Sequence, residues 1–168
     1  MTDYYSPDGG LPPQTTLHTG RAIFKEAYAF IPKGVMTDIV TSRFPNWDKT
    51  RAWILARPLS GFAETFSQYI MEVSPNGGSL NPEPEVNAEG FLFIVSGQLD
   101  LDLGGATYKM IEGGYAYISP NSDWKVVNSS TKNVTFHWIR KYYEKIDGFD
   151  VPESFVTNEK DIDPGGLT

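Results

Sequence analysis

Few residues in this sequence have side chains that bind metals or attack substrates. The chain has two histidines, His18 and His137, and no cysteine, so thiolate catalysis and a centre of three imidazoles from one chain are excluded. Three glutamates, Glu83, Glu85 and Glu89, could supply carboxylate oxygens to a hard cation. Prolines lie beside them, and carboxylates in such a loop are more often simply solvated. The sequence therefore predicts no metal ligand.

Asp123 and Lys125 flank Trp124 and form a second group of candidates. Lys125 could bind a substrate carboxylate, or act as a base if burial lowered its pKa. The alternative is a lysine at a strand end that reaches water, and it is favoured because lysines are rarely buried. No serine has a histidine nearby in the sequence to activate it. We therefore predict no catalytic residue.

The elements that must position these side chains are short strands. Between Gln98 and Leu103, three leucines alternate with polar residues, which is the period of a half-buried strand, and Gly104-Gly105 is typical of a hairpin turn. The cluster from Ser74 to Gly78 is expected to end the strand before it. Strands are predicted at Ala27–Ile31, Val35–Thr41, Arg51–Leu55, Phe62–Val73, Phe91–Val95, Gln98–Leu103, Tyr108–Ile111, Tyr115–Ile118, Trp124–Val127 and Val134–Ile139.

Many short strands with Gly and Pro between them, and no helical stripe before Lys141, favour a sandwich or barrel. The length of 168 residues suits one domain. We expect a flexible N-terminal arm over residues 1–19, a barrel over 20–147 and a linker-like segment over 148–168. The last segment is polar and contains two prolines.

Two stretches have the glycine, proline and apolar spacing of the motifs that build a cupin barrel, the jelly-roll fold also called a double-stranded β-helix. They are GSLNPEPEVNAEGFLFIVSG, from Gly78, and GYAYISPNSDWKVVN, from Gly114. Cupin motifs place three histidines and a glutamate at fixed positions, which here hold Pro84, Val86, Lys125 and Gly90. The fold is therefore predicted to be an all-β cupin without its usual metal.

Within such a barrel, polar side chains near the mouth are the candidates for binding a small polar molecule. His137 alternates with Phe136 and Trp138, and we expect it inside the barrel beside a hydrogen-bond partner. The predicted binding residues at the mouth are Glu83, Glu85, Asp123, Lys125 and His137.

From Arg21 to about Asp161 the chain resembles the N-terminal half of the bicupin (S)-ureidoglycine aminohydrolases, also described as glyoxylate-induced proteins. The stretches that support the resemblance are RAIFKEAYAFIPKGV, YIMEVSPNGGS, EGFLFIVSGQLDLDLGG, IEGGYAYISPNSDW and FHWIRKYYEKIDGFDVPESFVTNEKDI. The resemblance implies a hydrolase of purine and allantoin degradation that releases ammonia from ureidoglycine. In that family a second cupin domain holds the manganese and the substrate. The first is a degenerate barrel that packs against it and contributes to oligomer assembly.

The resemblance implies that this chain alone lacks the active site, and that its partner is a second cupin domain or another copy. The main alternative is a free-standing degenerate cupin that binds a small polar ligand or acts as a dimeric regulator. An enzyme with a carboxylate-bound metal is a third possibility. A net charge of −7 disfavours nucleic acid. Without a signal-like N-terminus or a long apolar run, we expect a cytoplasmic protein that does not span a membrane.

Overall fold

The structure, a computed structural model, describes residues 23–25, 28–31, 44–56, 65–163 and 165. The chain divides into two compact units, Met1–Val40 and Thr41–Thr168. In the first unit, β1 (Ile23–Phe24) and β2 (Ala29–Phe30) pair as an antiparallel hairpin. The predicted arm over residues 1–19 and the strand predicted at Val35–Thr41 lie outside the described residues.

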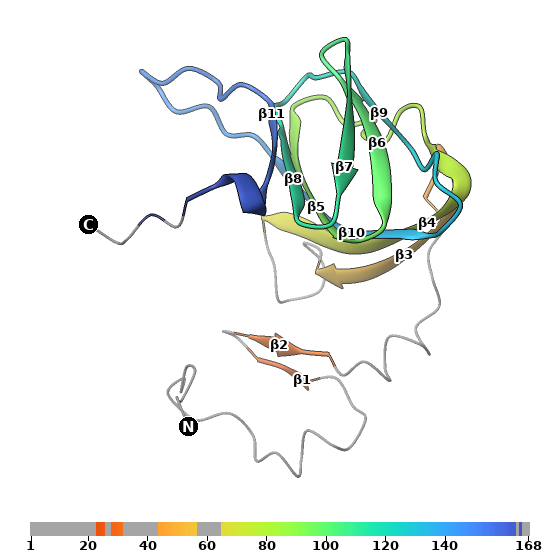
Figure 1. The fold of residues 1–168 in the computed structure, drawn as a ribbon. Helices are drawn as coiled ribbons and strands as arrows, with labels where there is room; N and C mark the ends of the chain where they lie inside the picture. The colour runs from red at the N-terminus through yellow and green to blue at the C-terminus, as the bar shows by residue number, and fades with distance from the viewer. Residues whose placement is uncertain (1–22, 26–27, 32–43, 57–64, 164, 166–168) are drawn as a thin grey trace. The chain divides into compact units, whose positions relative to one another are not determined.

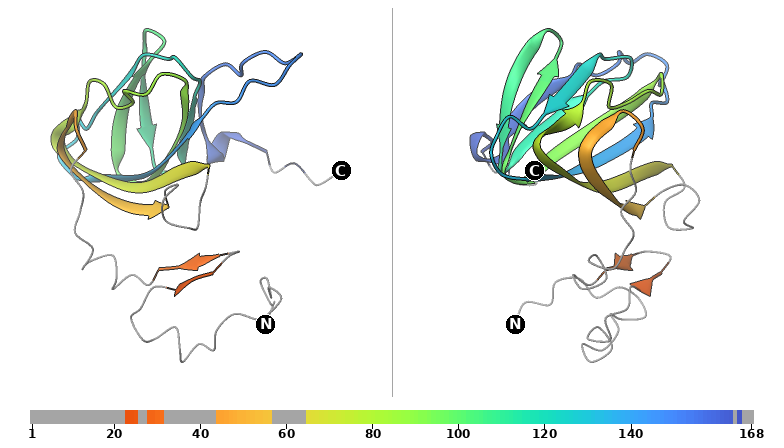
Figure 2. Two further views of the ribbon diagram at one scale, coloured as in Figure 1. Left: turned by 180° about the vertical axis from the view of Figure 1, so that it is seen from behind. Right: turned by 90° about the vertical axis from the view of Figure 1, so that its right-hand side faces the viewer.

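The second unit is one antiparallel sheet of nine strands that curls on itself (Figures 1 and 2). The strand order is β11-β8-β5-β10-β4-β9-β6-β7, with β3 paired to β4. Its two end strands, β11 and β7, contact each other, so the barrel is nearly closed. The strands are β3 (Trp47–Ala56), β4 (Phe66–Ser79), β5 (Ala88–Ser96), β6 (Gln98–Leu103), β7 (Ala106–Ile111), β8 (Gly114–Ile118), β9 (Trp124–Val127), β10 (Val134–Tyr142) and β11 (Phe155–Asn158).

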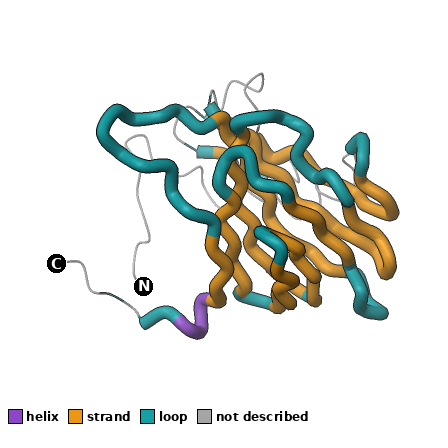
Figure 3. Tube along the Cα trace, turned by 90° about the horizontal axis from the view of Figure 1, so that it is seen from above, coloured by secondary structure: helices purple, strands orange, loops and turns teal. Residues whose placement is uncertain are grey.

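The prediction of an all-β barrel is confirmed. The described part of the chain has no α-helix, only the short 3-10 turn η2 (Glu159–Asp161), which follows β11 and is drawn in purple in Figure 3. No helix among these residues is long and apolar enough to cross a bilayer.

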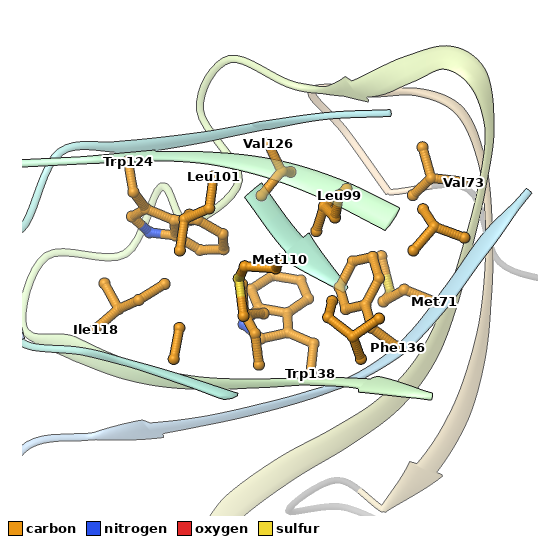
Figure 4. Close-up of a cluster of buried hydrophobic side chains, with 14 of the residues drawn as sticks. Met71, Val73, Leu99, Leu101, Met110, Ile118, Trp124, Val126, Phe136 and Trp138 are labelled. Atoms are coloured by element: carbon orange, nitrogen blue, oxygen red, sulfur yellow. The ribbon is translucent and has the colours of Figure 1, made fainter. Parts of the chain in front are cut away.

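The alternation within the strands determines which side chains fill the barrel. Leu99, Leu101 and Leu103 all lie in the buried core, as their period-two spacing predicts. Phe136 and Trp138 enter it from β10, and Figure 4 shows both side chains extending from this strand to the same side, toward Leu99 and Leu101. Burial of this apolar surface is the main force that closes the sheet.

The prediction that the Ser74–Gly78 cluster ends a strand is wrong, because β4 continues to Ser79. Before the cluster β4 pairs with β3 and β10, and at the end of the cluster Gly78 pairs with Val127 of β9. The register against β3 shifts here, which marks a bulge. A Cβ on Gly78 would lie 2.0 Å from the Val126 carbonyl oxygen. The glycine is therefore needed for close approach of two strands and does not terminate β4.

Asn128 holds the end of β9 in place through its side chain. It is fully buried; its amide nitrogen donates to the Val73 and Lys132 carbonyl oxygens, both at 2.8 Å. Its amide oxygen accepts from the Ser130 N–H and hydroxyl. All its hydrogen-bonding groups are used, so the residue stabilises the loop before β10.

We expect Asn128→Ala to lower the free energy of unfolding by about 2 kcal/mol, because it leaves two carbonyl oxygens without their donor. Asn128→Asp is the companion variant: it keeps the acceptor for Ser130 and replaces the donor with a buried carboxylate oxygen that faces the two carbonyl oxygens. Urea denaturation should show a loss of stability for both variants. Unchanged stability of either one would contradict this role for the amide nitrogen.

The segment 148–168, predicted to be linker-like, is partly built into the barrel. Residues Phe155–Asn158 form β11, whose register with β8 places Phe155 opposite Tyr117. Val156 packs against the core. The polar sequence does not indicate this strand, because an edge strand needs only one apolar face. Its hydrogen-bonding partner, β8, is also far away in the chain.

Candidate functional site

A cavity of about 310 Å³ lies at the mouth of the barrel. The loop between β4 and β5 forms one side, and the connection from β8 to β9 forms the other. Its apolar lining includes Ile118, Trp124 and Trp138. Polar side chains also line it, from Asn81, Glu83, Ser119, Ser122 and Asp123. The lining therefore combines apolar side chains with a larger share of polar groups, which could bind a polar molecule.

Glu83 is the buried charge of this cavity. Its side chain is 8% exposed, and its Oε1 lies 2.6 Å from Nη2 of Arg140. The same oxygen accepts the Glu85 N–H at 3.0 Å. The other oxygen, Oε2, is buried and has no hydrogen-bond partner among the described residues. Burial raises the pKa of the Glu83 carboxyl above its ordinary value, although the Glu85 N–H and the Arg140 guanidinium act in the opposite direction.

Trp138 supplies the second unpartnered polar atom of the cavity. The residue is 1% exposed, and its indole Nε1–H has no acceptor within the described residues. Gly90 lies directly across from Ile118 in the neighbouring strand and also lines the cavity. A Cβ at Gly90 would lie 3.6 Å from Trp138 Nε1, an ordinary contact. The missing side chain therefore leaves space beside the indole N–H.

Serine hydroxyls line the opposite side. The hydroxyl oxygens of Ser119 and Ser122 lie 3.0 Å apart, and the hydroxyl oxygen of Ser154 lies within 3.3 Å of both. The Ser154 hydroxyl also accepts the Ser119 N–H. This network fixes the connection between β8 and β9 against the segment that leads into β11.

Three of the five predicted binding residues, Glu83, Glu85 and Asp123, line the cavity. The carboxylate of Glu85 also accepts the Tyr142 hydroxyl at 2.6 Å. The structure does not bring Lys125 to them. Lys125 is exposed, and it pairs in register with Asp102 while its neighbours Trp124 and Val126 are buried in the core. It therefore projects from the outer surface of the barrel.

His137 also lies outside the barrel, so the prediction of an interior histidine is wrong. Phe136 and Trp138 point into the core, and the side chain between them must point outward. The expected hydrogen-bond partner is present: Nε2 of Gln68 lies 3.4 Å from Nδ1 of His137. His137 pairs with Ile70 of β4 and with Phe93 of β5. Burial in this apolar setting lowers the pKa of the imidazole below its ordinary value.

This lowered pKa predicts a pH dependence of stability. The unfolded chain binds the proton of His137 more readily than the folded one does. The contribution of His137 is therefore fully present above its ordinary pKa and is lost as the pH falls through the lowered pKa. Melting temperatures of the wild type and of His137→Asn should be compared between about pH 8 and pH 5. The wild type should lose more stability than the variant on acidification; parallel curves would contradict the assignment.

The residues at the usual cupin metal positions do not fit a metal ion. Pro84 and Val86 line the cavity without a ligating side-chain atom, and Gly90 has no side chain. At the fourth position Lys125 points outward, and the inward residue beside it is Trp124. Elsewhere in the described ranges, no three His, Asp or Glu side chains are grouped as a metal site would require.

Glu89, one place from the usual glutamate position, is directed away from the cavity. Its Oε2 accepts the Tyr117 hydroxyl at 2.9 Å, and burial, together with this bond, raises the pKa of Tyr117. Sequence reasoning missed Trp138 and Arg140 as residues of the site. The alternation of β10, which orients both in the same direction as Phe136, could have indicated them.

Three relatives are similar to this chain over most of its length. The (S)-ureidoglycine aminohydrolase of Escherichia coli strain K12 is 28% identical over 135 residues, covering 79% of this chain and 49% of that protein. The crystal structure of a glyoxylate-induced protein from Pseudomonas aeruginosa is 57% identical with a TM-score of 0.79, covering 97% of this chain and 59% of the other. The Escherichia coli protein Ylba is 25% identical with a TM-score of 0.76, covering 90% of this chain and 61% of the other.

The chain thus spans about half to three fifths of the length of these relatives. The family model described as a EutQ-like cupin domain matches residues 60–143, half of the 168 residues. That range includes β4 to β10 and with them the strands that surround the cavity. On the strength of this match and of the nearly closed antiparallel barrel, the chain belongs to the EutQ-like cupin family.

Proposed function

We propose that this chain is the non-catalytic cupin domain of a ureidoglycine aminohydrolase-like protein of purine degradation. The manganese-dependent release of ammonia from ureidoglycine would take place in a second cupin domain. The similarity to the ureidoglycine aminohydrolase of Escherichia coli and to the glyoxylate-induced protein supports this proposal. A cytoplasmic location is part of the same proposal.

The observation that carries the non-catalytic role is the side-chain composition of the barrel mouth. The positions where cupins bind their metal hold Pro84, Val86 and Gly90, and the inward residue beside Lys125 is Trp124. None of these can ligate a cation through its side chain. A domain without ligands in this position can still act as a scaffold, since its barrel and core are complete.

The scaffold role is supported by apolar side chains exposed on the C-terminal part of the domain. Ile146 and Phe149, in the segment between β10 and β11, are 64% and 69% exposed. Tyr142, Val151, Phe155 and Ile162 extend this set along the same stretch. Several large apolar side chains exposed along one stretch are typical of a surface that another domain covers. The relatives are longer than this chain by roughly a further domain, and we assign the surface to that second cupin domain.

An ammonia-release assay with (S)-ureidoglycine and Mn²⁺ tests the proposal. The ureidoglycine aminohydrolase of Escherichia coli serves as the positive control. We expect no ammonia above background from this chain alone, and release at a rate comparable to the control would overturn the non-catalytic role. A blot of the native cells should show a band of about twice the 18.7 kDa of this chain. A band at 18.7 kDa would instead indicate a free-standing cupin.

The exposed surface leads to a separate prediction for the chain alone. Without a second domain to cover Ile146 and Phe149, the chain should self-associate as its concentration rises. The double variant Ile146→Ser/Phe149→Ser should shift light-scattering masses toward the monomer. Leu80→Ser, which alters another exposed apolar residue in the loop between β4 and β5, is the matched control. Equal masses for all three proteins would contradict the assignment.

A further inference from the structure

Two buried polar atoms without a hydrogen-bond partner among the described residues belong to side chains that line the cavity at the barrel mouth. These are the acceptor Oε2 of Glu83 and the donor Nε1–H of Trp138. Their side chains are 8% and 1% exposed. Buried polar atoms in folded proteins almost always have partners, so an unpartnered pair at one cavity indicates that something else is hydrogen-bonded there.

The two atoms are held in place by the surrounding structure. Arg140 binds the other oxygen of Glu83, and its guanidinium carbon lies 5.6 Å from the centre of the Trp138 ring. Trp138 is packed between aromatic rings of Trp47, Tyr69 and Trp124. Neither group can turn away to find another partner without breaking these contacts. The free acceptor and the free donor are therefore preorganised.

The charge of the lining limits what can bind. The cavity is lined by three carboxylates, from Glu83, Glu85 and Asp123, and no lysine or arginine is among the described residues that line it. Arg140, which is not among these lining residues, forms an ion pair with Glu83. An anion would meet net negative charge, whereas an uncharged donor can be accepted by Oε2. A volume of about 310 Å³ is at the lower end of the range for small-molecule pockets.

We propose that this cavity binds a small uncharged polar molecule, an amide or a polyol. Its N–H or O–H donates to Glu83 Oε2, and its carbonyl or hydroxyl oxygen accepts from Trp138 Nε1. Both ligand types provide a donor and an acceptor within a few atoms of each other. The space left by Gly90 beside the indole N–H is where the accepting oxygen lies. Because the inference concerns binding by this barrel, it stands whether or not the domain belongs to a ureidoglycine aminohydrolase.

The indole N–H of Trp138 provides a local probe of binding. In ¹H–¹⁵N spectra of the whole chain, its signal is identified by its loss in Trp138→Phe. Acetamide and glycerol are titrated separately, with acetate as the anionic comparison. We expect a saturable shift of this signal with acetamide, with glycerol or with both, and no saturable shift with acetate. Comparison of acetamide with glycerol shows whether the site binds an amide or a polyol.

Two variants assign the shift to the cavity. Gly90→Val places a branched side chain beside Nε1 at a site where a Cβ makes only ordinary contacts, and it should abolish saturation. Glu83→Gln replaces the accepting carboxylate and should weaken binding about tenfold. Lys125→Ala, on the outer surface, should bind as the wild type does. Melting temperatures test whether each variant is folded. If Glu83→Gln does not fold, the result for Gly90→Val decides whether the ligand binds in the cavity.

Several outcomes would overturn the proposal. Linear, unsaturable shifts that persist in Gly90→Val would show that the cavity holds only water, which could satisfy both polar atoms. Saturable binding of acetate would refute the charge argument. This experiment measures ligand binding by the chain alone. The proposed function is tested by ammonia release and by the mass of the native protein, so the two proposals can fail independently.

Discussion

Trp138→Ala should lower the free energy of unfolding by about 3–5 kcal/mol, the largest effect of any single core truncation in this barrel. The indole lies at the centre of an aromatic cluster, with ring centres 5.5 Å from those of Trp47 and Tyr69 and 6.1 Å from those of Phe44 and Trp124. Removing it leaves a cavity among rings contributed by β3, β4 and β9, which cannot collapse without moving the sheet. A loss of this size is a large part of the stability of an ordinary domain.

Urea denaturation followed by circular dichroism measures the effect. Trp138→Phe is the matched control, because it keeps an aromatic ring in the cluster and removes the unpartnered N–H. We expect it to lose markedly less stability than the alanine variant. Equal losses would contradict the assignment of this stability to the packing of an aromatic ring in the cluster.

Gly78→Ala should be almost as damaging, with a loss on the order of 4 kcal/mol or failure to fold. A Cβ at this position would lie 2.0 Å from the Val126 carbonyl oxygen and 2.9 Å from its carbon. Both atoms belong to the backbone of β9, so the clash can be relieved only by separating β4 from β9. Gly78 also has a φ of +142°, which L-residues rarely adopt.

Gly104→Ala separates the clash from the backbone strain. Gly104 has a φ of +61° in the turn between β6 and β7, and a Cβ there would meet nothing within 4 Å. We expect it to cost only about 1–2 kcal/mol, the strain of a left-handed residue. Thermal unfolding of both variants provides the comparison. Similar losses would mean that strain alone, without the close approach of two strands, requires glycine at position 78.

Much of the barrel could be predicted from the sequence because strand alternation is a local property. The leucines of Gln98–Leu103 and the apolar residues of Val134–Ile139 were identified as strands, and both are in the core. The same alternation could have excluded Lys125 and His137 from the mouth, since each lies between two buried residues. For Lys125, the exposed position agrees with the favoured interpretation of a lysine that reaches water, whereas the spacing of the metal motif alone suggests the mouth.

The sequence by itself determined the fold class, the inward leucines of Gln98–Leu103 and the absence of ligating side chains at Pro84, Val86 and Gly90. Those features depend on residue type and on spacing within one strand. Only the tertiary structure decided that Glu83 meets Arg140, 57 residues away, and that Trp138 lines the same cavity as Glu83. It also decided that β11 pairs with β8. Such contacts depend on how distant strands are registered against each other, and registration is set by the packing of the whole barrel.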